Sequence, residues 1–148
     1  MVRFQLVIDC ADPDRLARFW AAALHYELEP APAGFDSWDD YYRDLGLGEE
    51  FLGHGEDSIC DPRGEGPRIW FQRVPDVKSV KNRLHIDVAA GGDRSVPIET
   101  RKARVDAEVL RLAGLGATMT EGLAELEPGL DHYAVAMTDP EGNEFDVN

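Results

Sequence analysis

The sequence predicts an α+β fold in which two βαβββ-type units, about residues 1–78 and 79–148, form one domain of 148 residues. In each half an alternating strand is followed by an amphipathic helix, and an Asp-Pro-x-Gly turn precedes the last strand. The turn Asp61-Pro62-Arg63-Gly64 recurs as Asp139-Pro140-Glu141-Gly142, and the opening strands align Gln5 with His85. Both landmarks recur after about half of the chain, which indicates a duplicated unit. A ferredoxin-like βαβ domain is the alternative, and it would make the recurrence accidental.

The first half begins with a strand over residues 4–9, whose alternation places Phe4, Leu6 and Ile8 on the face that a helix would cover. Asp12 followed by Pro13 is typical of a helix start. The apolar spacing that follows predicts an amphipathic helix ending near His25. Residues 29–67 are punctuated by Pro and Gly, with a short helical segment expected in SWDDYYRDLG and a strand end before Asp61. Residues 68–74 predict the last strand of this half.

The second half repeats this order after a polar connection, PDVKSVKN. Residues 84–89 alternate, which places Leu84, Ile86 and Val88 on the helix-covered face. A helix is expected at about 101–114, with Gly114 and Gly116 as its terminators. Strands are expected in residues 117–120, 132–139 and 143–147.

Composition and charge exclude several classes of function. Lys and Arg number 15 against 29 Asp and Glu, a net charge of −14, which repels nucleic acid and anionic lipid surfaces. Two distant cysteines, Cys10 and Cys60, form no disulfide framework or zinc motif and are expected to be inert thiols. The N-terminus does not resemble a signal peptide, and no apolar run approaches the length of a membrane span, so a cytoplasmic protein is expected. No Walker, GxSxG or HExxH pattern occurs in a supporting context.

Four polar side chains interrupt the strands that open and close the two halves: Gln5, Gln72, His85 and Asp146. If the two units close into one curved sheet, these four groups converge in its concavity and form a small-ligand or metal site. His85 is a candidate metal ligand or acid–base group, or else a histidine bonded to nearby backbone. Asp146 is a candidate base or a buried, hydrogen-bonded carboxylate. The two glutamines could orient a ligand or bond within the sheet.

Aromatic residues provide candidate ligand-binding walls. Trp38, Tyr41, Tyr42 and Phe51 lie in the irregular stretch, where they either line the cavity or pack a satellite core under a long loop. Trp70 is the aromatic residue expected at the cavity wall. His54 and His132 lie near turns and are expected to be exposed.

Three segments, DCADPDRLARFWAAAL, KNRLHIDV and DPEGNEFDV, together resemble the glyoxalase-like branch of the vicinal oxygen chelate superfamily. The resemblance implies paired βαβββ modules in an eight-stranded open barrel, with helices on its convex side, often as a homodimer. It also implies metal ligands at the positions of Gln5, Gln72, His85 and Asp146. Metal-dependent members usually have Glu at the two last-strand positions, whereas this chain has Gln72 and Asp146. A set with one carboxylate counts against a tightly held metal.

The resemblance implies two functions from different classes. The first is a small-molecule enzyme of the lyase, isomerase or dioxygenase type, with His85 and Asp146 as catalytic residues and one divalent metal ion (Fe, Ni, Zn or Mn) as cofactor. The second has no metal and binds or sequesters a small molecule, as a drug-resistance protein does. His85 favours the enzyme, and the pair Gln72 and Asp146 favours the binding protein. The sequence does not identify the substrate or the ligand.

Overall fold

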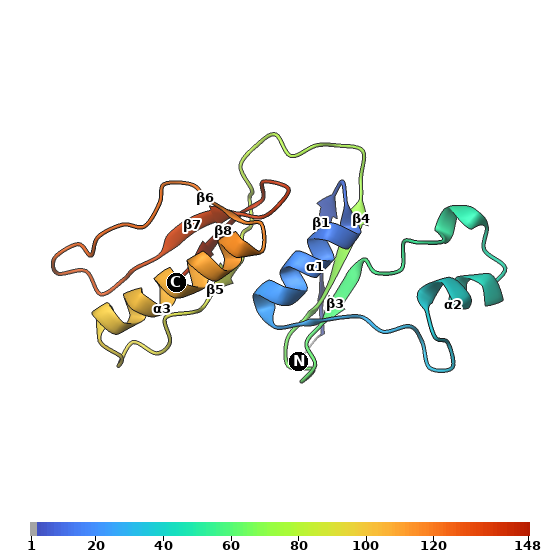
Figure 1. Ribbon diagram of the computed structural model, residues 1–148, viewed down its shortest axis with the longest axis horizontal. Helices are drawn as coiled ribbons and strands as arrows, with labels where there is room; N and C mark the ends of the chain where they lie inside the picture. The colour runs from blue at the N-terminus through green and yellow to red at the C-terminus, as the bar shows by residue number, and fades with distance from the viewer. Residues whose placement is uncertain (1–2) are drawn as a thin grey trace. The chain divides into compact units, whose positions relative to one another are not determined.

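The computed structural model describes residues 3–148, and the chain divides into two compact units, Met1–Val77 and Lys78–Asn148 (Figure 1). Each unit contains one four-stranded mixed sheet and one long helix. The predicted α+β class and the duplicated module are therefore confirmed. The strands of the described residues form two separate sheets, and the existence of a single domain over 1–148 stays a prediction.

The first module contains β1 (Gln5–Cys10), α1 (Pro13–Leu24), β2 (Glu27–Leu28), α2 (Trp38–Asp44), the 3₁₀ helix η1 (Glu49–Phe51), β3 (Ser58–Cys60) and β4 (Arg68–Arg73). Its sheet order is β1-β4-β3-β2. β1 runs parallel to β4, and the other pairs are antiparallel. The parallel pair is possible because α1 provides the crossover between distant strands.

The second module contains β5 (Asp87–Val88), α3 (Ile98–Gly114), β6 (Thr118–Met119), β7 (Val135–Thr138) and β8 (Glu144–Val147). Its order, β5-β8-β7-β6, repeats that of the first module, with β5 parallel to β8. Among residues 3–148, no helix is long and apolar enough to cross a membrane.

α1 covers one face of the first sheet. Asp12 accepts a hydrogen bond from the Arg15 backbone N–H at 3.2 Å, and Pro13 occupies the first turn, so the predicted helix start is confirmed. His25 ends the helix in a left-handed conformation, as predicted for its end. The fully buried core of this module includes Leu16 and Phe71.

α3 covers the second sheet and packs against β6, β7 and β8. Its buried stripe includes Val105, Val109 and Leu112. The helix begins at Ile98, earlier than the predicted residue 101, because the Pro97 carbonyl already accepts the first helical hydrogen bonds. Beneath it Phe145 is 1% exposed, which makes β8 a core strand.

Two apolar residues assigned to covered faces are instead exposed. Phe4 is 68% exposed and Leu84 is 85% exposed, because each precedes the first residue of its paired strand. The strand predicted at 84–89 is paired as a strand only at Asp87–Val88. The strand predicted at 132–139 is likewise shorter, and it comprises Val135–Thr138.

The two Asp-Pro-x-Gly turns have the same construction. The Asp61 carboxylate accepts hydrogen bonds from the backbone N–H groups of Arg63, Glu65 and Gly66 at 2.9–3.0 Å. Asp139 accepts from the backbone N–H groups of Glu141 and Asn143 at 2.9 and 3.0 Å. Gly64 and Gly142 have positive φ, which an L side chain rarely adopts. The recurrence found in the sequence is therefore a structural repeat.

The Asp61 turn should make stability depend on pH. The backbone N–H groups of Arg63 and Gly66 hold the pKa of Asp61 below its ordinary value of 3.8. A carboxyl whose folded pKa is lowered stabilises the protein above its unfolded pKa, and that contribution is lost as pH falls through the folded pKa. We therefore expect Asp61→Asn to destabilise the protein at pH 7, with the difference from wild type shrinking towards pH 3. Urea unfolding at both pH values measures this, and a pH-independent difference would contradict it.

Candidate metal site in the second module

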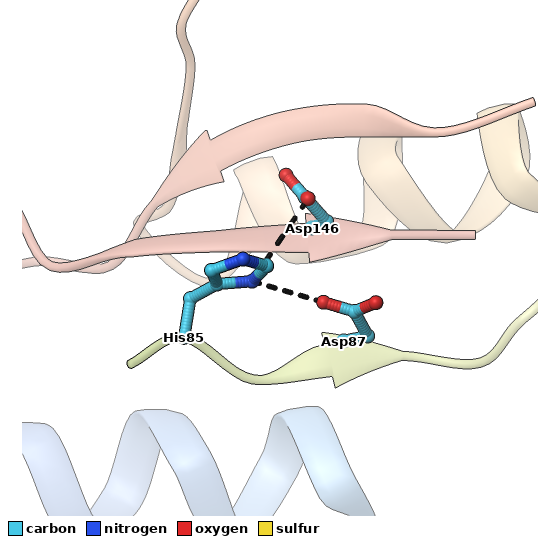
Figure 2. Close-up of side chains that lie close together, drawn as sticks. All are labelled: His85, Asp87 and Asp146. Carbon is cyan, nitrogen blue, oxygen red and sulfur yellow. Dashed lines mark ion pairs between the residues drawn. The ribbon is translucent and has the colours of Figure 1, made fainter. Parts of the chain in front are cut away.

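Three titratable side chains lie on the same face of the second sheet. β5 pairs with β8 in register Asp87 with Asp146, and the Asp146 backbone N–H donates to the Ile86 carbonyl at 3.1 Å. Phe145 and Val147 are buried on the α3 side. Alternation therefore directs Asp146 and Asp87 to the opposite face, where His85, two residues before Asp87, joins them (Figure 2).

The three side chains are close enough to share one ion. His85 Nδ1 lies 3.0 Å from Asp87 Oδ1 and 3.9 Å from Asp146 Oδ2. One ligand atom from each residue lies within 4.8 Å of the others, and residues 3–148 contain no other His, Cys, Asp or Glu group of this kind. Ligands about 2.0–2.3 Å from a common ion are separated by roughly 3–4.5 Å, so the cluster needs little adjustment to close on a metal.

The chemistry of the donor set also fits a divalent ion. One imidazole and two carboxylates suit Zn, Fe or Mn, and the two negative charges match the charge of the ion. The side chains of His85, Asp87 and Asp146 are 42%, 51% and 37% exposed, so the site is open to a small molecule. Asn148 donates its side-chain amide to Asp87 Oδ2 at 3.0 Å, which leaves the other carboxylate oxygen towards His85.

Glu144 lies on the same face of the sheet, but its carboxylate interacts with groups outside the cluster. Its carboxylate accepts the Asn82 backbone N–H at 3.0 Å and lies 2.9 Å from Lys78 Nζ. These two contacts, the Asn82 N–H first, lower the pKa of Glu144 to about 2. Glu144 therefore anchors the segment that leads into His85.

Sequence reasoning identified His85 and Asp146 but missed Asp87. The signal was present, because Asp87 follows His85 at the two-residue spacing that shares a strand face. With Asp87 the cluster has two carboxylates, so the objection that the set holds one carboxylate does not apply to it.

The first module positions Gln5 and Gln72 differently from the predicted arrangement. Gln5 pairs with Arg68, and Gln72 pairs with Asp9. If Gln5 corresponds to His85, the position that corresponds to Asp146 is Trp70, not Gln72. The predicted equivalence of Gln72 and Asp146 is thus shifted by two residues. Convergence of Gln5, Gln72, His85 and Asp146 in one cavity stays a prediction.

The open face of the first sheet carries a hydrogen-bonded network. Arg68 donates to the Gln5 side-chain carbonyl at 2.8 Å and forms a two-point ion pair with Glu29 at 2.8 and 2.5 Å. Trp70 donates its indole N–H to Asp57 at 2.9 Å. A fixed guanidinium on the Gln5 oxygen disfavours a second cation there, so this face differs in chemistry from the metal candidate.

The other candidate residues from the sequence lie outside the cluster of His85, Asp87 and Asp146. Trp38 donates its indole N–H to the Glu29 carbonyl at 2.9 Å, and Tyr41 packs edge-on against Phe35 with ring centroids 5.2 Å apart. His54 and His132 are exposed, as predicted. Burial raises the pKa of the Cys60 thiol, which agrees with an unreactive cysteine.

The glyoxalase-like domain family matches residues 5–148, nearly the whole chain, and the protein belongs to that family within the vicinal oxygen chelate superfamily. Three solved structures have a similar fold. A hypothetical protein from S. aureus is 12% identical, with 99% of this chain and 92% of that chain covered and a TM-score of 0.59. A glyoxalase/bleomycin resistance protein/dioxygenase family enzyme from Burkholderia phytofirmans PsJN is 14% identical, with 97% and 94% covered and a TM-score of 0.59.

The fosfomycin resistance protein FosX from Listeria monocytogenes is 12% identical, with 99% of this chain and 89% of that chain covered and a TM-score of 0.57. No curated protein matches the sequence. Identities this low show a shared fold.

Proposed function

We propose that the second module binds one divalent metal ion through His85, Asp87 and Asp146, and that the protein is a metal-assisted enzyme acting on a small molecule. The observation that carries this is the approach of three ligand atoms, from β8, β5 and the segment just before β5, to within 4.8 Å of one another. The three side chains are 37–51% exposed on an open sheet face, so substrate oxygens can approach beside them. The fold and superfamily are compatible with a lyase, isomerase or dioxygenase.

The residues of the cluster have separable roles in this proposal. A bound metal would act as a Lewis acid on a substrate oxygen. Asn148 orients Asp87, whose Oδ1 lies 3.0 Å from His85 Nδ1, a separation that suits two ligands of one ion. Asp146, which is farther from His85, is the carboxylate best placed to receive a proton from a substrate bound on this face.

A substitution at Asp87 tests the three-residue site. Asp87→Asn removes one charge and one ligand oxygen, so we expect it to weaken Zn²⁺ or Mn²⁺ binding by at least about tenfold. Asp146→Asn should have an equal or larger effect. Isothermal titration calorimetry of both variants measures the change, with Asp93→Asn, an exposed loop carboxylate of the same module, as the matched control. If Asp87→Asn binds metal like wild type, Asp87 is not a ligand.

The competing function is a metal-free protein that binds or sequesters a small molecule. It is favoured by the first module, where Arg68 occupies the Gln5 oxygen and Trp70 stands at the position corresponding to Asp146. Metal analysis of protein purified without a histidine tag separates the two functions. Absence of stoichiometric metal, with no uptake of Fe, Ni, Zn or Mn, would reject the enzyme.

We also propose a homodimer in the cytoplasm. Each four-stranded sheet ends in edge strands, and β1 carries the exposed Val7, so backbone and apolar groups are available for pairing between chains. Cys10 and Cys60 are not joined in a disulfide within residues 3–148, which suits a reducing compartment. Light scattering at micromolar concentration should give twice the chain mass of 16.4 kDa, and a monomer mass would contradict the dimer.

A further inference from the structure

The first module contains a cavity of about 520 Å³. The first turn of α1, the end of β2 and the segments around residues 30–39 and 53–56 line it. This volume lies within the usual range for small-molecule sites. The cavity lies wholly within the first module, so it does not depend on the metal candidate.

The charge of the cavity wall is one-sided. Five acidic residues line it, Asp14, Glu29, Asp36, Asp39 and Glu56, and no Lys, Arg or His is among the lining residues. Three of the five have partners: Glu29 pairs with Arg68, Glu56 pairs with Arg18, and Asp39 accepts the Gly53 backbone N–H at 2.8 Å. The wall therefore favours a cation.

Asp14 is the acidic residue of this wall that has an enclosed oxygen without a hydrogen bond in the described part of the chain. Its Oδ1 atom is enclosed and has no hydrogen-bond partner within residues 3–148. Burial raises the pKa of Asp14, and the nearby charges of Glu56 and Asp12 raise it further, against smaller opposing effects of Arg18 and His54. A cation bound in the cavity would offset this cost by attraction to the whole carboxylate.

Aromatic and apolar side chains supply the rest of the wall. Trp38 and Phe35 line the cavity together with Leu28. The Trp38 indole N–H is already bonded to the Glu29 carbonyl, which fixes the ring. A Cβ at Gly55 would lie 2.1 Å from Trp38 Cβ, so a glycine is needed for Trp38 to pack this closely. Fixed aromatic walls beside carboxylates suit a cation with an apolar body.

The arrangement distinguishes an organic cation from a metal ion. In residues 3–148 the groups of three or more potential ligands within metal-binding distance comprise His85, Asp87 and Asp146 alone. The carboxylates of the cavity are therefore spread around its wall and do not converge on one point. An ammonium group matches the negative charge of this wall and can donate N–H bonds to whichever carboxylate oxygens face the cavity.

We propose that this cavity binds a protonated primary amine carried on an aromatic body. The ammonium group pairs with Asp14, and the body packs against Trp38 and Phe35. Asp36 adds a second negative charge to the wall.

Titration calorimetry with 2-phenylethylamine tests the proposal on the full chain. We expect one molecule to bind per chain, at least tenfold more tightly than 2-phenylethanol, which replaces the ammonium by a hydroxyl. The anion 3-phenylpropionate should not bind. The Trp38 indole N–H signal in an NMR spectrum should shift on addition of the amine, which places the molecule in this cavity.

Asp14→Asn should weaken amine binding at least tenfold, and Asp36→Asn provides a second test if the first variant does not fold. Glu99→Gln removes a carboxylate from the first turn of α3 and should leave binding unchanged, which makes it the matched control. Equal binding of amine and alcohol would overturn the proposal, as would unchanged binding in the folded Asp14 variant. Binding of Ca²⁺ without binding of the amine would also overturn it.

Discussion

His85→Ala is expected to abolish stoichiometric metal binding while changing the stability of the protein little. His85 contributes the one imidazole of the cluster, and the two carboxylates that remain are half exposed and well hydrated. Loss of a direct ligand should exceed the roughly 10–100-fold effect of removing an outer-shell partner, so we expect at least about a 100-fold loss of affinity. The side chain is 42% exposed and carries little core packing, so the free energy of unfolding should change by less than about 1 kcal/mol.

Metal content by mass spectrometry, Mn²⁺ or Zn²⁺ titration and urea unfolding together measure this expectation. His132→Ala is the matched control, because His132 is exposed and lies outside the cluster. If His85→Ala unfolds the protein and metal binding persists in what remains folded, His85 is structural. The site would then lie elsewhere.

Phe145→Ala should be the most destabilising of these substitutions, at about 3–5 kcal/mol. Phe145 is 1% exposed on β8, beneath α3, so truncation removes a large buried side chain and leaves a void. It also immediately precedes Asp146, and loosening of β8 should weaken metal binding as a secondary effect. Urea unfolding of the wild type and the variant measures the change in the free energy of unfolding.

Phe51→Ala serves as the control, because the Phe51 side chain is 46% exposed. It should cost about 0.5 kcal/mol or less. Equal costs at the two positions would show that β8 is not packed against α3 as described.

Much of the local structure could be predicted because its causes are local. The start of α1 follows from Asp12 and Pro13, and its buried face follows from apolar spacing. The paired turns follow from Asp61 and Asp139, whose carboxylates accept backbone N–H groups within five residues. Such interactions form within a short segment, so the sequence pattern contains them.

The candidate site could be predicted in part. Alternation identified the faces of His85 and Asp146, and it contained Asp87 as well, which was not recognised as a ligand. Strand ends were less predictable, and Leu84 is exposed because hydrogen-bonded pairing with β8 begins after it. Pairing depends on a distant partner strand, which a local pattern does not specify.

By itself the sequence determined the α+β class, the duplicated βαβββ order and the polar identity of the strand faces. Tertiary structure alone decided the register of the parallel pairs, which matches Trp70 rather than Gln72 with the position of Asp146. Residues 65–67 separate Gly64 from β4, whereas Asn143 alone separates Gly142 from β8. A shift of two residues keeps every side chain on the same face, so alternation cannot detect it. Only the pairing of distant strands could therefore show that Asp87 and Asp146 lie side by side.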